Sequence, residues 1–426
     1  MNNSYQKYFL IFDKKIIFTI LIVFLSFFLR LIYLYLSEGF SRNPIEDSLD
    51  YHNHALNLIG KGEYFVLGQE GNKIFSSRPP LLPFFLSAVY LLPFENKILL
   101  GRFLQIIISS FTVYLSFVVS RKFGLNLKVS LLIMFIACCY PPSVFYSSRI
   151  LTENLAAMLL LLSMLFLLHY FSKKNIFHLI LAALFLSLLT LTRSSYLLLP
   201  FFLIFILLIT GAISKRKLFK RHHISLFIIF SIIFLSPWTY RNYLIHEEIM
   251  PTTSRLGYML YLSNNSLENS EILKGGYSKE GSLFRDEKFP NYSELKQNEI
   301  YLDEAISEIF SKPKLFFFAA YQRIENTLTW RPNPIARTAW VSSDYIMFII
   351  WFPILIFFCF SIIYLRKIPI LITWIFLLYI LGISMFFWGI PRLRYPVDSI
   401  MIISALSFIN FYYLDIKDKF FVNRNE

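Results

Sequence analysis

Cysteine, charged residues and glycine-rich motifs are all scarce in this sequence. Its 426 residues include three cysteines, Cys138, Cys139 and Cys359, all inside apolar runs, which argues against a disulfide framework and a cysteine-based metal cluster. Only 16% of the residues are charged. No glycine-rich phosphate loop follows a candidate strand and no Ser-His-Asp set stands out, so we do not expect a soluble nucleotide as the energy source.

Apolar residues are what the sequence has in excess. They make up 56% of the chain, with 47 Phe and 26 Tyr, which is more than a soluble domain of this size could bury. Many apolar runs are about 17–22 residues long, enough to cross a bilayer as a helix. We predict an all-α polytopic membrane protein of about ten transmembrane helices, with interfacial helices and one large outer loop. The predicted spans are 16–37, 98–120, 128–146, 150–171, 176–192, 196–213, 223–240, 344–365, 368–388 and 396–414.

Charges at the ends of these runs predict the topology. The stretch RPPLLPFFLSAVYLLPF at 78–94 is short and carries four prolines, so we interpret it as an interfacial or re-entrant helix. If it does not cross and both termini are cytoplasmic, the basic clusters at 121–128, 173–174 and 214–223 fall on the cytoplasmic side, as the positive-inside rule requires. The net charge of +14 then reflects topology and not nucleic-acid binding. The first run is too long and too late for a cleaved signal peptide.

Two sizeable pieces lie on the outer side in this topology. In the second, 293–310 has the pattern of an amphipathic helix, and 312–330 that of a helix on the membrane surface with aromatic anchors. The predicted segments are a cytoplasmic N-terminus at 1–15, a transmembrane module at 16–240 that includes the first outer loop 38–97, a large extracytoplasmic loop at 241–343, transmembrane helices at 344–414 and a cytoplasmic tail at 415–426.

Three carboxylates, Glu46, Asp47 and Asp50, follow directly on the first apolar run. Carboxylates near lipid lose hydration, so their presence needs a reason. A general base beside a phosphate site is one explanation. The alternative is structural, because acids in a first helical turn favour the helix dipole, with Asp47 or Ser48 as the cap.

Charged residues also collect at the outer ends of the predicted spans, where the positive-inside rule disfavours basic residues. The bases among them are all arginine, whose planar fork fits phosphate oxygens and stays charged when partly buried. We favour a shared anionic ligand, although contacts with lipid headgroups or with the local glutamate would also explain single members. The set is Arg149, Glu153, Arg193, Arg241, Arg392 and Arg394.

These residues lie in segments that resemble a known family, the GT-C fold glycosyltransferases, and within it the branch of the protein O-mannosyltransferases and the lipid A aminoarabinose transferase. The acidic residues before Tyr51 resemble the start of the first outer loop of that branch. The other matching segments, in family order, are SRPPLLPFFLSAVYLL, SSRILTENL at 147–155, LTRSSYLLLP at 191–200, SPWTYRNY at 236–243 and GIPRLRYPVD at 389–398. The third has Ser194 where the family has proline, and in the last Pro396 follows Tyr395 directly.

The resemblance implies a GT-C-like fold and transfer of a sugar from a polyprenyl monophosphate to an envelope acceptor outside the cytoplasm. It aligns Asp47 with the catalytic aspartate, and Asp50 is the competing assignment. We expect an inverting displacement in a bacterial inner membrane, with the active site on the extracytoplasmic side. The expected phosphate-binding residues are Arg193, Arg241, Arg392 and Arg394, and the expected orienting residues are Glu46, Tyr51, Arg78, Arg149 and Glu153.

Neither a cofactor nor a metal is expected beyond the donor, because several guanidiniums neutralise a monophosphate. A metal site of Asp50 with His52 and His54 is the alternative, but the i,i+2 spacing puts the two histidines on different helix faces. Two other functions share these features. One is a transporter or flippase of a lipid-linked sugar, which predicts polar residues deep in the membrane. The other is an oligosaccharide ligase that uses a lipid diphosphate.

Overall fold

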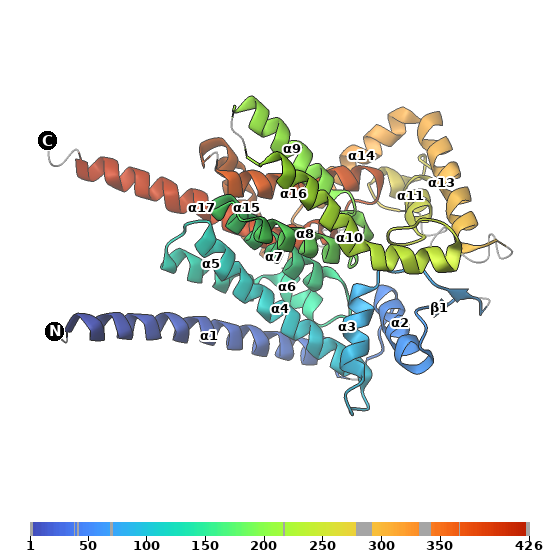
Figure 1. Cartoon of the computed structure of the whole chain (residues 1–426), viewed down its shortest axis with the longest axis horizontal. Coiled ribbons are helices and arrows are strands. Elements are labelled where there is room, and N and C mark those ends of the chain that lie inside the picture. Colours follow the sequence, from blue (N-terminus) through green and yellow to red (C-terminus); the bar gives the residue numbers. More distant parts are fainter. Residues whose placement is uncertain are drawn as a thin grey trace.

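The computed structural model describes residues 3–37, 39–40, 42–68, 71–215, 218–277, 292–331, 342–365 and 367–422. Parts of the predicted outer loop, at 278–291 and 332–341, and the end of the predicted tail, at 423–426, lie outside these residues. Both termini lie at one end of the molecule, and α2, β1, α11 and α13 gather at the opposite end (Figure 1). We call the end opposite the termini the outer end, after the predicted topology; the side of the membrane that it faces stays a prediction.

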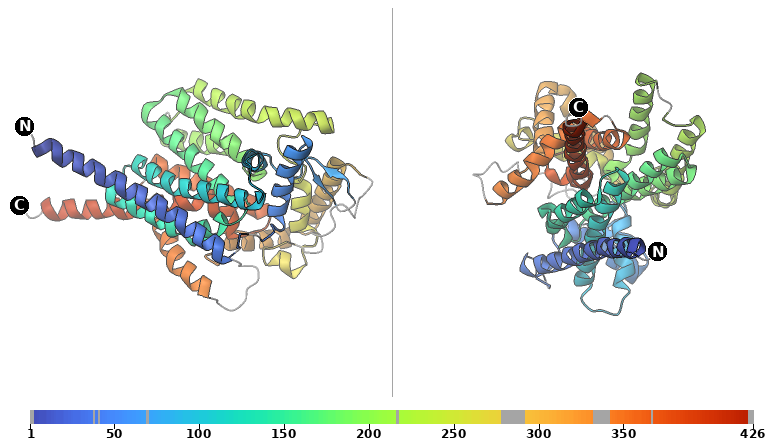
Figure 2. Two further views of the ribbon diagram at one scale, coloured as in Figure 1. Left: turned by 90° about the horizontal axis from the view of Figure 1, so that it is seen from below. Right: turned by 90° about the vertical axis from the view of Figure 1, so that its left-hand side faces the viewer.

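Eight helices of the described chain are long and apolar enough to cross a membrane. The all-α polytopic fold is thereby confirmed. Helix α1 lies at the periphery of the bundle, against α4, α5 and α6 (Figures 1 and 2). The eight are α1 (Asn3–Ser37), α4 (Lys97–Lys122), α7 (Glu153–Lys173), α9 (Leu199–Ile213, preceded by the 3-10 turn Ser194–Tyr196), α10 (Arg221–His246), α15 (Ser342–Leu365), α16 (Ile368–Phe386) and α17 (Pro391–Val422).

The two remaining predicted spans depart from single long helices. The span at 128–146 is a pair, α5 (Leu127–Cys139) and α6 (Pro141–Ser147), bent by 50°. The bend falls at Tyr140, which is extended (ψ 115°) because the following proline disfavours helical geometry in the residue before it. The span at 176–192 is α8 (Ile176–Thr190), whose 15 residues are about 22 Å long and short of a full crossing.

A buried arginine holds this bend in place. Arg30 on α1 is fully buried, and its guanidinium donates to the backbone carbonyl of Cys138 at 3.2 Å, one of the carbonyls at the end of α5. It also donates to the hydroxyls of Ser109 and Ser143, each at 2.7 Å. These bonds link α1 to α4, to the end of α5 and to α6, close in sequence to the loop that carries Arg149.

The outer end is built from short elements. The stretch at 78–94 contains a helix of only ten residues, about 15 Å long, which is too short to cross. The predicted amphipathic helix at 293–310 is confirmed, and 312–330 is also helical, whereas its place on a membrane surface stays a prediction. These elements are α2 (Asp47–Lys61), β1 (Val66–Leu67) paired antiparallel with β2 (Lys73–Ile74), α3 (Leu81–Tyr90), α11 (Leu256–Asn264), α12 (Ser270–Leu273), α13 (Glu294–Ser311) and α14 (Pro313–Leu328).

Helix α7 is the centre of the apolar core. It packs against α4, α8 and α17, and most of its side chains are buried. Since α7 begins at Glu153 and α17 begins just before Arg392, the packing of these two helices brings both residues to the outer end of the bundle. The core therefore fixes the geometry of the charged site described next.

Candidate active site

The acidic cluster lies at the N-terminus of α2, where the backbone of the preceding residue is strained. Glu46 has φ 50°, a conformation that residues other than glycine rarely adopt, so the surrounding contacts must hold it. Asp47 and Asp50 lie in the first turn, where the helix dipole favours acids. Glu46 is the cap residue and makes no side-chain cap hydrogen bond. The capping role considered for Asp47 or Ser48 is therefore not what the structure shows.

Acidic and basic side chains alternate through the outer end of the bundle in one connected chain of ion pairs. Among the described residues, four arginines and three carboxylates take part, and their formal charges sum to one excess positive charge. Its members come from α2, α7, α17 and three loops, which are far apart in the sequence. In order, the pairs are Arg193–Glu153 (2.8 Å), Glu153–Arg392, Arg392–Asp47 (3.0 Å), Asp47–Arg78, Arg78–Asp50 (2.8 Å) and Asp50–Arg255 (3.8 Å).

Asp47 is at the middle of this chain, between two guanidiniums. Burial would raise the pKa of Asp47, but Arg78 and Arg392 outweigh it and hold the pKa of this carboxyl well below its usual range. The carboxylates of Asp47 and Asp50 and the Tyr51 hydroxyl in turn raise the pKa of Arg78 against the effect of its burial. Asp47 is therefore an ionised acceptor at neutral pH.

A pocket of about 360 Å³ opens beside Asp47. Four arginines from four different segments line it: Arg42 in the first outer loop, Arg102 on α4, Arg149 after α6 and Arg392 on α17. Apolar and aromatic residues, among them Pro44, Ile45, Phe145, Tyr146, Ile150 and Leu151, make up much of the remaining wall. We call this the arginine pocket. A pocket with several guanidiniums and apolar walls suits an anionic headgroup with an apolar tail.

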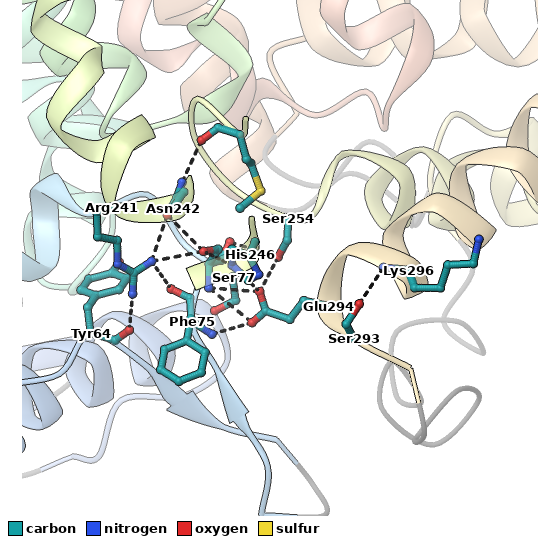
Figure 3. Close-up of polar contacts among 12 residues, drawn as sticks. Tyr64, Phe75, Ser77, Arg241, Asn242, His246, Ser254, Ser293, Glu294 and Lys296 are labelled. Carbon is teal, nitrogen blue, oxygen red and sulfur yellow. Dashed lines mark hydrogen bonds and ion pairs between the residues drawn. The ribbon is translucent and has the colours of Figure 1, made fainter. Parts of the chain in front are cut away.

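Two of the four arginines predicted to bind phosphate, Arg193 and Arg392, are brought together by the Glu153 carboxylate, and the other two lie elsewhere. Of this pair, Arg392 lines the arginine pocket and Arg193 is not among the residues that line it. Arg241 lies over the ring of Trp238 at 4.6 Å and donates to the backbone carbonyls of Tyr64 and Phe75 (Figure 3).

Arg394 faces a different part of the protein. Its side chain is fully buried, donates to Asp398 at 2.8 Å and lies over the ring of Trp351 at 3.7 Å. Arg392 and Arg394 are two positions apart on one helix, about 200° around its axis, so they cannot share a ligand on one face. These contacts give Arg394 a place in the core of the bundle.

The orienting residues predicted from the sequence are mostly at the site. Arg78 and Glu153 are members of the ion-pair chain, and Tyr51 lies under the Arg78 guanidinium at 5.4 Å. Glu46 and Arg149 line the arginine pocket, where Arg149 stacks on Phe145 at 3.9 Å.

Some residues at the site are absent from the sequence prediction. Arg102 is at the outer end of its span, so the criterion that selected the other arginines would have found it. Arg42 and Arg255 lie in loops, where the sequence carries no such signal. Tyr277 packs its ring against Trp388, with centroids 5.4 Å apart, and burial, with the charges of Glu46 and Asp47, raises the pKa of its hydroxyl.

The two histidines considered as metal ligands point to other partners. His52 shares a hydrogen bond with the Tyr90 hydroxyl at 2.8 Å, and His54 stacks on the ring of Tyr64 at 4.2 Å. Within the described ranges, no group of three or more His, Cys, Asp or Glu side chains is placed to hold a metal ion. A site of Asp50 with both histidines is therefore not formed.

Comparisons with known proteins agree with this architecture. The family model of the dolichyl-phosphate-mannose-protein mannosyltransferases matches residues 77–240, the segment from just before α3 into α10. No curated protein sequence matches significantly. The archaeal oligosaccharyltransferase AglB from Archaeoglobus fulgidus, in complex with an inhibitory peptide and a dolichol-phosphate, matches with a TM-score of 0.61 at 11% identity, over 100% of this chain and 52% of that one.

The chain has the fold of the GT-C glycosyltransferases. The apo oligosaccharyltransferase of the same archaeon matches with a TM-score of 0.55 at 11% identity, over 96% of this chain and 51% of that one. ArnT from Cupriavidus metallidurans bound to undecaprenyl phosphate gives a TM-score of 0.43 at 11% identity, over 91% and 76% of the two chains. The chain spans about half the length of the archaeal structures that it matches.

Proposed function

We propose that this GT-C protein is a glycosyltransferase that moves a sugar from a polyprenyl monophosphate to an envelope lipid, glycan or protein outside the cytoplasm. The position of Asp47 carries the proposal. Its carboxylate lies between Arg392 on the wall of the arginine pocket and Arg78 on its other side. Transfer from a phosphate ester needs a base that accepts the acceptor's proton and groups that stabilise the leaving phosphate, and both are present here. The bacterial inner membrane, with the site facing outward, is the location that fits the topology.

The arginine pocket would hold the donor phosphate. Guanidiniums bind phosphate oxygens through paired, charge-assisted hydrogen bonds, and the apolar walls suit the first units of the prenyl chain. The description of the matched family names a dolichyl-phosphate sugar, and the AglB complex contains a dolichol-phosphate, which supports a lipid phosphate as donor. Stabilisation of a leaving group of this kind is typically worth about 3–4 kcal/mol per key donor.

The transfer is a single displacement in this mechanism. The acceptor hydroxyl or amine attacks the anomeric carbon and gives its proton to the Asp47 carboxylate. The bond between that carbon and the phosphate oxygen breaks as the new bond forms, and the configuration inverts. The electron pair of the broken bond stays on the polyprenyl phosphate, whose developing second charge is held by Arg392 and the other pocket arginines. The protonated Asp47 then releases its proton to water.

Donor binding would also tune the base. In the free protein, Arg392 divides its hydrogen bonds between Glu153 and Asp47. A phosphate in the pocket competes for the same guanidinium and weakens its hold on Asp47. The carboxylate then becomes more basic when the donor is present, which matches proton acceptance to the loaded state.

One other function has an observation in its favour. The two archaeal structures described above, with TM-scores of 0.61 and 0.55, are of an oligosaccharyltransferase, which favours an oligosaccharide ligase that uses a lipid diphosphate. The two proposals differ in the donor headgroup. A flippase for a lipid-linked sugar would bind the same headgroup but would not break the bond to phosphate.

Native mass spectrometry on the full-length protein in lipid nanodiscs tests the donor class. We expect undecaprenyl phosphate to bind more tightly than undecaprenyl diphosphate, and an undecaprenyl-phosphate sugar incubated with envelope extract to release undecaprenyl phosphate. Preference for the diphosphate would support the ligase, and binding without release in any extract would support the flippase. Mass spectrometry of envelope glycans in a deletion strain would then identify the sugar and the acceptor.

A further inference from the structure

A second pocket, of about 120 Å³, lies on the outer end between β2, α11 and α13. It is separate from the arginine pocket, and among the described residues the two share no lining side chain. We call it the tyrosine pocket. Its lining residues are Asn72, Lys73, Ile74, Ser254, Tyr258, Tyr292, Ser293, Glu294, Gln297, Asn298 and Tyr301.

One face of α13 forms a wall of this pocket. Ser293 caps the helix by accepting from the backbone N–H of Lys296 at 3.3 Å. Glu294, Gln297, Asn298 and Tyr301 follow at intervals of three and four residues, so their side chains share one helical face. The Ser293 cap fixes where α13 begins, and the helical repeat then determines which of its side chains line the pocket.

Helix α11 supplies the opposite wall at close range. The backbone N–H of Gly257 donates to the Asn298 side-chain oxygen at 2.7 Å. A Cβ at Gly257 would come within 2.0 Å of the Asn298 backbone oxygen, so only glycine allows the two helices to approach this closely. The rings of Tyr258 and Tyr301 lie edge to face, with centroids 5.3 Å apart. The pocket thus has rigid walls.

The two charged residues of the tyrosine pocket are already compensated by protein groups. Lys73 pairs with Glu63. Glu294 accepts from the backbone N–H groups of Phe75 and Ser76, and from the Ser254 hydroxyl at 3.0 Å (Figure 3). Among the described residues, no arginine lines this pocket. In contrast with the arginine pocket, the described part of this lining carries no charge that lacks a protein partner.

The remaining polar groups of the described lining are three tyrosines, three side-chain amides and two serine hydroxyls. Several of them already make one hydrogen bond within the protein, as Ser254, Gln297 and Asn298 do, and such groups can make more than one. Hydroxyl and amide groups both donate and accept hydrogen bonds, which matches the hydroxyls of a sugar, and a tyrosine adds an aromatic ring that packs against C–H groups. The volume has room for one ring and not for a chain. A single neutral sugar residue is the ligand that fits both the size and the chemistry.

The tyrosine pocket is connected to the proposed catalytic site. Ser254 lines it, and the next residue, Arg255, is the last member of the ion-pair chain, 3.8 Å from Asp50. The arginine pocket therefore adjoins the middle of the ion-pair chain, at Asp47 and Arg392, and the tyrosine pocket adjoins its Arg255 end. A donor held in the arginine pocket and an acceptor held in the tyrosine pocket would approach Asp47 from different sides.

We propose that the tyrosine pocket is an acceptor subsite that binds one neutral sugar residue, so that the acceptor is a glycan or glycolipid. This inference rests on the proposed function. The sugar bound there is not the reacting one, because Asp47 lines the arginine pocket and is not among the lining residues of the tyrosine pocket. It positions the acceptor so that a neighbouring hydroxyl or amine reaches the donor.

Saturation-transfer NMR on the full-length protein in nanodiscs tests this subsite with a panel of methyl glycosides of neutral hexoses, pentoses and N-acetylhexosamines. We expect at least one glycoside to receive saturation. Gln297→Met and Tyr258→Phe remove polar groups from different walls and should each weaken binding about tenfold, the effect of losing one good hydrogen bond. Tyr261→Phe is the matched control, since Tyr261 packs on the ring of Tyr301 but does not line the pocket.

The outcomes separate this inference from the proposed function. Asp47→Asn should leave glycoside binding unchanged, and undecaprenyl phosphate should still bind to Gln297→Met. If no glycoside receives saturation, or if Gln297→Met and Tyr258→Phe bind as well as Tyr261→Phe, the subsite is refuted while the donor site stands. Thermal unfolding of each variant checks its fold, and a folding failure in one variant leaves the other to decide.

Discussion

Asp47 at the start of α2 and Arg392 near the start of α17 form an ion pair of 3.0 Å. It joins the first outer loop to the last helix of the bundle. Because Arg392 also lines the arginine pocket, the pair is where a bound phosphate would meet the proposed base. The predictions below test the two residues and their surroundings.

Asp47→Asn keeps the shape of the side chain and removes proton acceptance. Transfer should fall by about 10² or more, the usual contribution of a placed base, and undecaprenyl phosphate should still bind. Asp50→Asn should have a smaller effect, because Asp50 pairs with Arg78 and Arg255 and does not line the arginine pocket, and Glu46→Gln a smaller one still, because the Glu46 side chain makes no cap hydrogen bond at α2. Transfer rates with saturating donor provide the measurement. If Asp50→Asn loses transfer activity while Asp47→Asn retains it, Asp50 is the base.

Arg392→Lys keeps the charge but loses the fork that contacts both Asp47 and a phosphate. We expect activity to fall by about 10²–10³, as for loss of one key donor to the leaving group, with little change in thermal unfolding. Arg394→Lys is the comparison, because its side chain is buried against Asp398 and Trp351. That variant should lower the unfolding temperature and protein yield. A stable, inactive Arg394→Lys would place Arg394 in the site after all.

Arg149 lines the arginine pocket and stacks on the ring of Phe145 at 3.9 Å. Arg149→Gln should weaken binding of undecaprenyl phosphate about tenfold or more, since a hydrogen bond to a charged group is worth about 1.5–3 kcal/mol. The control Arg121→Gln makes the same change in charge at the C-terminal end of α4, whereas the pocket residue Arg102 lies near the N-terminal end of that helix. This variant should leave binding unchanged. Native mass spectrometry measures both. Equal losses would point to a general effect of net charge.

The pH dependence of transfer should reflect the two arginines at Asp47. Their charges lower the pKa of Asp47, so its carboxylate stays ionised as the pH falls from 7 to about 4, the usual pKa of this group. We expect no loss of kcat/KM from this group in that range. Arg392→Gln removes one partner and should move the acidic limb to higher pH. An acidic limb near pH 6 in the unmodified protein would identify a different base.

The same pKa direction makes a statement about stability. A carboxyl whose folded pKa is below its unfolded value stabilises the fold at every pH above the unfolded value, and this contribution is lost as the pH falls through the folded value. Asp47 should therefore contribute its full share at neutral pH. Unfolding temperatures of the protein and of Asp47→Asn should converge only below about pH 4.

Removal of divalent cations should leave transfer unchanged, because a monophosphate held by several guanidiniums needs no metal for charge balance. The rate of purified protein with and without a chelator measures this. Activity that is lost with the chelator and restored by magnesium or manganese would contradict the monophosphate mechanism and would favour the lipid-diphosphate ligase.

The sequence by itself determined much of the membrane architecture. Apolar runs mark the helices because the backbone must satisfy its hydrogen bonds internally in lipid, and the acidic start of α2 is visible because its residues are contiguous. Two predicted spans differ for local reasons that a run of apolar residues conceals. Tyr140 precedes a proline and breaks one of them, and the other, α8, ends after 15 residues.

Only the tertiary structure decided which charges meet. Outer arginines can be recognised along the chain, but the direction of each side chain depends on how its helix is rotated in the bundle. Packing of α7 and α17 turns Arg392 toward Asp47 and Arg394 into the core. Arg42 reaches the arginine pocket and Arg255 reaches Asp50 from loops that carry no periodic pattern. Ion pairs between distant segments form only after the apolar helices have packed, because the charges contribute little until the core holds them within a few ångströms.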